Sequence, residues 1–150
     1  MKNLFVETDA EELKTRLALL KPDSRRLWGR MSVAQALAHC CLGMQTGTGE
    51  LRPPRVLIGR ILGPIIKPKV VGDDSPMRPN SPTAKALLVH SEPDFATEQA
   101  RLSGLIDQFV TAGPQGCSTH PHAFFGPLTP DEWAILMYKH IDHHLRQFGV

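Results

Sequence analysis

The sequence predicts an all-α protein, an antiparallel four-helix bundle with a long crossover between its second and third helices. Apolar residues recur at helical spacing in four stretches, helix-capping patterns precede several of them, and no segment alternates convincingly as a β-strand does. The 150 residues also match the size of one ordinary domain. We therefore expect residues 1–150 to fold as a single helical unit.

The first two helices are expected before residue 50. The first is predicted over about 9–20, with Thr8 or Asp9 as its cap. The second is predicted to begin at Ser32, because Ser32 and Gln35 have the spacing of a capping box, and to run to about Met44. Glycines are then expected to stop it, namely Gly43, Gly47 and Gly49.

The last two helices have the clearest boundaries. The third is predicted from Pro93 or Asp94 to Ala112, where a Gly-Pro pair ends it. The fourth is predicted to start after Thr129, which is followed by proline at the first helical position and by glutamate three residues after the cap. It is expected to run to about Phe148.

Residues 53–93 differ in composition from the rest, because eight of the 13 prolines lie there. A structureless loop of that length is uncommon within a compact domain, so a folded excursion is predicted, with a short helix over about 56–62. Two interpretations stay open. The segment either covers the bundle, which we favour, or acts as a lid over a pocket.

Composition excludes several classes of protein. A formal net charge of +2 and the absence of a basic run argue against a nucleic-acid partner. No segment is long and apolar enough to cross a membrane, and the N-terminus does not resemble a signal peptide, so a cytoplasmic protein is expected. Three cysteines do not suggest a disulfide framework.

The chemistry of the sequence lies in its histidines. His140 and His144 are four residues apart on the last predicted helix, so both rings project from one face, about 40° apart around the axis. That face also carries Trp133, Leu136 and Met137, and it must pack inward. Two imidazoles so placed can hold one metal ion at about 2.0–2.1 Å. The alternative is a pair of buried, hydrogen-bonded imidazoles.

A metal site needs a further ligand, and His39 on the second helix is the best candidate. By periodicity alone it lies about 120° from the apolar stripe of its helix, which favours a boundary or surface position. The charged residues of the last helix are expected in water on the face opposite the histidine pair, solvated or ion-paired: Lys139, Asp142 and Arg146.

Two motifs resemble those of a known superfamily. The run from Leu27 to Gln35, followed by His39, resembles the second-helix signature of the DinB-like superfamily of four-helix metalloproteins. The run KHIDHHLRQF from Lys139 to Phe148 is similar to its fourth-helix signature, and HAFFGPL from His122 to Leu128 resembles a branch of unknown function.

The resemblance implies an antiparallel four-helix bundle with a long crossover, which suits the excursion at 53–93. It implies a zinc, nickel, iron or manganese ion held by His39, His140 and His144. Some members of that superfamily transfer low-molecular-weight thiols such as bacillithiol, mycothiol or glutathione, and many pair as homodimers. The proline-rich segment and the two loop histidines, His120 and His122, depart from the thiol-transferase pattern.

Three neutral histidines would leave coordination positions open, as in a catalytic site, where the ion lowers the pKa of a bound water or thiol. Gln35, Gln147 and His122 are candidates for supporting this site; Gln35 and Gln147 otherwise only cap or end helices. For His120 and His122 an exposed loop position is favoured, and a proton shuttle or a replacement ligand is the alternative.

These observations favour a metal-dependent enzyme, thiol-transferase-like or hydrolase-like, acting on a small molecule. The first rival is a non-catalytic protein that binds a metal or a small molecule. The second is a structural helical domain with hydrogen-bonded histidines, which predicts no metal and little effect of a chelator. A homodimer is expected through the apolar residues 56–66.

Overall fold

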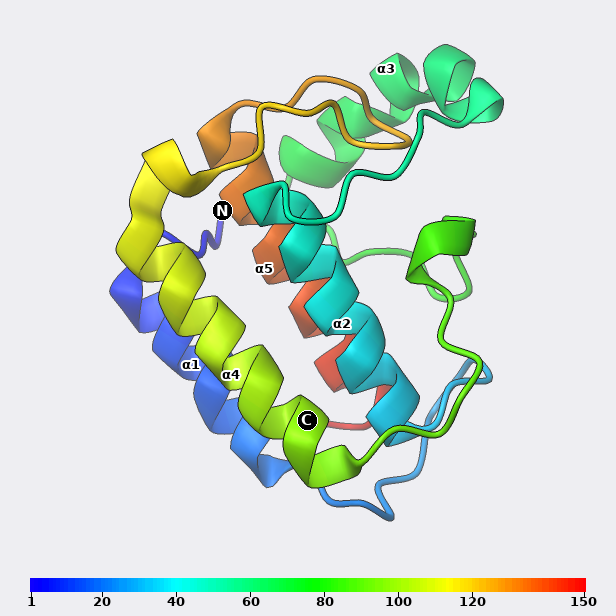
Figure 1. The fold of residues 1–150 in the computed structure, drawn as a ribbon, viewed down its shortest axis with the longest axis vertical. Helices are drawn as coiled ribbons and strands as arrows, with labels where there is room; N and C mark the ends of the chain where they lie inside the picture. The colour runs from blue at the N-terminus through cyan, green and yellow to red at the C-terminus, as the bar shows by residue number, and fades with distance from the viewer.

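The computed structural model describes residues 1–150 and is all-helical (Figure 1). It has five α-helices and no strand, apart from one isolated bridge between His122 and Gly126. The helices are α1 (Glu7–Leu19), α2 (Val33–Thr48), α3 (Leu57–Val71), α4 (Phe95–Ala112) and α5 (Pro130–Gln147), with short 3-10 helices η1 (Lys85–Leu87) and η2 (Gly113–Gly116). The predicted all-α class is confirmed. No helix is both long and apolar enough to cross a membrane.

Helix α1 begins earlier than predicted. It starts at Glu7 after Val6, which provides no side-chain cap, so the expected caps Thr8 and Asp9 lie inside the helix. The Asp9 carboxylate instead accepts a hydrogen bond from the amide of Asn3 at 2.9 Å. The carboxylate therefore fixes the N-terminal segment against the first turn instead of capping the helix.

Helix α2 starts as predicted and ends later. The Ser32–Gln35 capping box is present in both directions. The helix continues to Thr48, with Gly43 and Gly47 inside it, and ends where Gly49 adopts φ 81°, a left-handed conformation that favours glycine. Its residues are buried on most sides, because α4 and α5 pack against it and η1 contacts it as well.

The core lies between α1, α2, α4 and α5. Helix α4 packs on α1 and α2, and α5 packs on the same two helices (Figure 1). Asp94 caps α4 through the amide of Thr97, and Thr129 forms a capping box with Glu132 ahead of α5, as the sequence predicts. The largest fully buried side chains come from all four helices and the N-terminal segment, and include Leu4, Leu13, Met44, Phe109, Trp133 and Ile141.

The segment 53–93 contains a longer helix than predicted. Helix α3 spans 15 residues and includes Pro64 and Pro68, where the sequence predicted only a short helix over about 56–62. Its buried glycines rest on the loop before α5: a Cβ on Gly59 would lie 2.7 Å, and one on Gly63 2.3 Å, from the carbonyl oxygen of Phe124. Close backbone contact at these two glycines therefore anchors α3 beside the N-terminal part of α5.

Candidate metal centre

The structure brings the three predicted ligands together. The ligand atoms of His39, His140 and His144 all lie within 4.8 Å of one another, an arrangement that could hold a metal ion. His39 Nε2 and His140 Nε2 are 2.8 Å apart, and the ring of His39 lies edge-on to both other rings, with centroids 4.8 Å apart in each case. The histidine cluster, as we call these three residues, spans the contact between α2 and α5.

His39 is buried, contrary to the boundary position that periodicity favoured. Only 3% of its surface is exposed. Its Nδ1 lies 2.8 Å from the carbonyl oxygen of Leu87 in η1. A carbonyl oxygen can only accept, so Nδ1 carries the hydrogen and the Nε2 lone pair points toward His140. The covering segment 53–93 thus sets the tautomer of a residue on α2.

His144 is oriented in the same way from the other side. Its Nδ1 lies 2.8 Å from Oε1 of Gln147, and the amide nitrogen of Gln147 donates to the carbonyl oxygen of Trp28 at 2.9 Å. The second bond fixes which end of the amide faces His144, so Nδ1 is the protonated nitrogen. The Nε2 lone pair of His144 is then available within the cluster.

Gly43 on α2 leaves the space that the ring of His140 occupies. A Cβ on Gly43 would lie 2.6 Å from Nδ1 and 2.7 Å from Cε1 of His140. The sequence predicted this glycine as a helix stop; in the structure it lets α2 approach the His140 ring. No periodic pattern reveals this role, because it depends on which helix lies opposite.

The donor set fits a divalent ion. Nitrogens bound at 2.0–2.1 Å in tetrahedral geometry are about 3.3 Å apart, so the 2.8 Å pair needs to open by about half an ångström. His140 Nε2 donates to His39 Nε2 in this structure, and it becomes a ligand when that hydrogen moves or leaves. Imidazole ligands suit zinc, nickel, iron or copper, so the ligand set alone does not identify the metal.

A protein-family model described as "Protein of unknown function (DUF1569)" matches residues 2–149. The chain belongs to this family. No curated protein and no solved structure gave a significant match. For this DUF1569 member, the histidine cluster itself is therefore the guide to function.

The cluster is neutral near pH 7. Burial lowers the pKa of His39, and burial together with the repulsion that a protonated His39 would exert lowers the pKa of His140 well below its usual range. The same two causes lower the pKa of His144 to about 3. Because a metal competes with protons for imidazole nitrogens, burial keeps all three in the form that binds a metal.

Only one of the two glutamines proposed to support the metal site hydrogen-bonds to the histidine cluster. Gln147 contacts His144, as described above. Gln35 makes no hydrogen bond to the cluster: its amide serves the capping box and donates to the carbonyl oxygen of Ser91 at 3.1 Å. His143 lies beside His144, with ring centroids 5.0 Å apart, but its Nδ1 faces the carbonyl oxygen of Met77 at 3.2 Å, outside the candidate ligand group.

The loop histidines are half-buried, so the exposed position favoured from the sequence is wrong. The His122 ring stacks on Phe125 and meets the edge of Trp133, and burial lowers its pKa to about 4. Neither His120 nor His122 belongs to the candidate ligand group. The surrounding aromatic rings, supplied partly by α5, account for this burial.

On the charged face of α5, Arg146 is exposed as predicted, but Lys139 and Asp142 are buried. Lys139 and Asp142 are 8% and 7% exposed, because α1 and the chain after α3 cover that side. Asp142 pairs with Arg16 at 2.7 Å and Arg146 at 2.8 Å, and Lys139 donates to the carbonyl oxygen of Asp73. The expectation of ion pairing holds for all three residues, since Lys139 also pairs with the Asp73 carboxylate at 3.8 Å. The solvated position is wrong for Lys139 and Asp142.

Proposed function

We propose that this DUF1569 protein binds one divalent metal ion through His39, His140 and His144 and acts as a metal-dependent enzyme. The single observation that carries the proposal is the meeting of three neutral imidazoles, two of them held by carbonyl oxygens with Nε2 facing inward. Metal-binding histidines in proteins are oriented by such partners. The DinB-like resemblance of both motifs, with its antiparallel bundle, supports the same proposal.

An enzyme needs coordination positions that the protein leaves free. The group contains three imidazoles and no carboxylate or thiolate, which is the ligand count of catalytic zinc sites. When bound, such an ion supplies a Lewis acid that lowers the pKa of a water or thiol and polarises a substrate oxygen. We propose a low-molecular-weight thiol as substrate, with hydrolysis as the rival reaction.

The metal content of the purified protein tests the first step. Untagged wild type, prepared without chelator, is expected to hold about one ion per chain by inductively coupled plasma mass spectrometry. His140→Ala is expected to hold almost none. His90→Ala, which removes an exposed histidine far from the cluster in sequence, is the matched control and should match wild type. Equal metal in His140→Ala, or none in wild type after incubation with zinc, nickel, iron(II) and manganese, would overturn the proposal.

Turnover tests the second step. The loaded protein is assayed for transfer of glutathione sulfur to an alkyl halide, with release of halide, and for ester hydrolysis. Turnover by wild type and His90→Ala, lost in His140→Ala, supports an enzyme. Full metal occupancy without turnover of any substrate class supports the alternative, a non-catalytic protein that binds a metal or a small molecule.

We also propose that two copies pair through α3. Its outer face exposes apolar side chains, with Leu57 78%, Ile61 73% and Ile65 65% exposed. Contiguous apolar surface of this kind is typical of contact sites. Sedimentation velocity should show a dimer for wild type and a monomer for Ile61→Asp. A monomeric wild type at tens of micromolar would sink the pairing and leave the metal proposal intact.

A further inference from the structure

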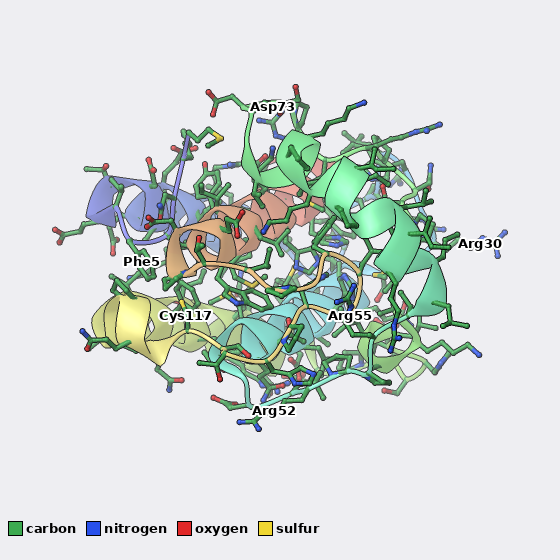
Figure 2. The ribbon with its side chains drawn as sticks, turned by 90° about the horizontal axis from the view of Figure 1, so that it is seen from above. Phe5, Arg30, Arg52, Arg55, Asp73 and Cys117 are labelled. Atoms are coloured by element: carbon green, nitrogen blue, oxygen red, sulfur yellow. The ribbon has the colours of Figure 1, made fainter.

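Arg55 is the one arginine whose side chain turns inward without an acidic partner in reach. It is half-buried just before α3, and its Nε is buried without a hydrogen-bond partner. None of the ion pairs or side-chain hydrogen bonds in the structure involves its guanidinium, whereas Arg16, Arg101 and Arg146 all pair with carboxylates. Figure 2 shows Arg55 among the ribbons of α3, α2 and the loop before α5, while Arg30 and Arg52 extend away from the molecule.

An unpaired guanidinium in such a position costs free energy, because burial removes water and no carboxylate replaces it. Its position is nevertheless fixed by the backbone. The amide of Val56 donates to the carbonyl oxygen of Ala123 at 3.0 Å, and a Cβ on Gly126 would lie 2.9 Å from an Arg55 terminal nitrogen. Gly126 has φ 80°, so glycine at this turn both permits the backbone and leaves space for the guanidinium.

His122 adds a second donor beside Arg55. Its Nδ1 accepts hydrogen bonds from the amides of Phe124 and Phe125, at 3.2 and 3.1 Å. The ring is neutral, because burial and the charge of Arg55 lower its pKa, so the hydrogen sits on Nε2. That N–H has no acceptor in the structure's hydrogen bonds. His120, in the same loop, likewise has a buried Nε2 without a partner.

The two groups lie toward the N-terminal end of the α5 face that carries the histidine cluster. Gly126, against which the guanidinium packs, pairs its backbone with that of His122 in both directions, at 2.8 and 3.0 Å. The His122 ring also meets Trp133, two helical turns before His140 on α5. A small molecule held by Arg55 would therefore extend toward the three imidazoles.

We infer that Arg55 and the Nε2–H of His122 form a subsite for the carboxylate of a small organic acid beside the candidate metal centre. The guanidinium offers paired N–H donors that match two carboxylate oxygens, and the carboxylate supplies the missing counter-charge. The inference deepens the proposed function by assigning an anionic substrate class, yet binding of the carboxylate itself needs no metal.

The test uses metal-free protein and defined anions. Sodium succinate is titrated against wild type at constant ionic strength set with sodium chloride, and the melting temperature and the His122 ring resonances are followed. Inorganic phosphate is the second arm, because a tetrahedral oxyanion could use the same donors. We expect succinate to raise the melting temperature in a saturable manner and to shift the His122 resonances, with a weaker response to phosphate.

Arg55→Gln should weaken succinate binding at least tenfold, and Arg55→Lys should restore only part of it, because lysine keeps the charge but lacks the planar fork. Arg52→Gln removes an exposed arginine three residues earlier and should bind as wild type. Without anion, Arg55→Gln should melt at or above the wild-type temperature, since an unpaired charge has been removed. A guanidinium with only a structural role would give the opposite result, a lower melting temperature.

Equal succinate binding by Arg55→Gln, or no binding by wild type, would overturn the inference. A stronger response to phosphate than to succinate would overturn the carboxylate assignment. His140→Ala separates this inference from the metal proposal: it should still bind succinate although it holds no metal. If wild type binds succinate but no metal, the proposed function is wrong and the carboxylate subsite stands.

Discussion

Helix α5 carries two buried polar clusters that differ in how their groups are satisfied. On one face Asp142 accepts a hydrogen bond from Arg16 and forms an ion pair with Arg146, and Arg16 also donates to the backbone oxygen of Val150. On another, His140 and His144 meet His39 with no counter-charge and with ring nitrogens directed at one another. The first cluster completes its own bonds, which is what a fold-stabilising network does. The second has no charge to balance, and the Nε2 lone pair of His144 accepts no hydrogen bond in the fold.

The largest expected contrast comes from removing one residue of each cluster. Asp142→Ala should destabilise the metal-free protein by about 2 kcal/mol, because it removes the main partner of the half-buried Arg16 and leaves only the longer pair with Glu12. His144→Ala should instead abolish the stabilisation by metal, which for wild type is about 2.7 kcal/mol at a free ion concentration of 100 times Kd. Urea unfolding with and without zinc measures both quantities.

Asp142→Ala should keep its full response to zinc, because Asp142 lies outside the ligand group. The comparison between the two clusters breaks down if His144→Ala still gains stability from zinc, or if Asp142→Ala loses that gain while remaining folded. An exposed substitution such as Arg26→Ala serves as the common control and should change neither quantity by more than about 0.5 kcal/mol.

Acid should destabilise the metal-free protein through its buried histidines. The folded pKa is about 3 for His144 and about 4 for His122, and the unfolded value is about 6.5. Both are lowered on folding, so below pH 6.5 the unfolded chain binds more protons and the free energy of unfolding falls. At pH 5 each contributes a loss of about 2 kcal/mol, whereas above pH 7 neither contributes.

Urea unfolding at pH 7 and pH 5 measures this loss. His144→Gln should reduce the difference between the two pH values by about 2 kcal/mol, because glutamine does not titrate. His90→Gln, at an exposed position, should leave the difference unchanged. An undiminished difference in His144→Gln would show that the ring is not held neutral in the folded protein.

The two glutamines proposed from the sequence offer a smaller, matched contrast. Gln147→Leu removes the acceptor for His144 Nδ1 and should weaken zinc binding about tenfold or more, as loss of a ligand's orienting partner does. Gln35→Leu removes half of a capping box and should cost about 1 kcal/mol of stability without changing zinc affinity. Competition with a chromophoric chelator measures the affinities, and equal weakening by both variants would contradict the assignment.

Local motifs made the two candidate ligands on α5 predictable. His140 and His144 share a helix, so their spacing alone places their rings side by side, and the start of α5 is fixed by its capping box. His39 could not be found in this way. Periodicity assumes one buried face, whereas α2 is enclosed by α4, α5 and η1, so the residue opposite the apolar stripe is buried too. The resemblance, and not the pattern, pointed to His39.

The length of α3 was missed because prolines usually interrupt helices. Pro64 and Pro68 are both exposed, and with Arg60 they fall on one solvent-facing stripe at a spacing of four residues. The carbonyl groups that lose their helical partners, those of Arg60 and Pro64, therefore lie where water can hydrate them. Similarly, the burial of Lys139 and Asp142 depends on α1 and the chain near Asp73, which their own helix cannot reveal.

The smallest expected effect concerns the glycine that the sequence assigned to a helix end. Gly43→Ala would place a methyl group 2.6 Å from His140 Nδ1, so the ring must move away from the other two. We expect zinc affinity to fall about tenfold, because the His140 ring must shift by roughly 0.8 Å to reach ordinary van der Waals contact at 3.4 Å. The matched control is Gly104→Ala in α4, where no atom lies within 4 Å of the added carbon.

Gly104→Ala should raise stability by up to about 1 kcal/mol through helix propensity and leave zinc affinity unchanged. Gly43→Ala gains the same propensity but crowds the ring, so the two variants separate helix formation from the geometry of the cluster. Unchanged zinc affinity in Gly43→Ala would mean that His140 does not need its present position against α2, and that the ligand set has to be reconsidered starting with that residue.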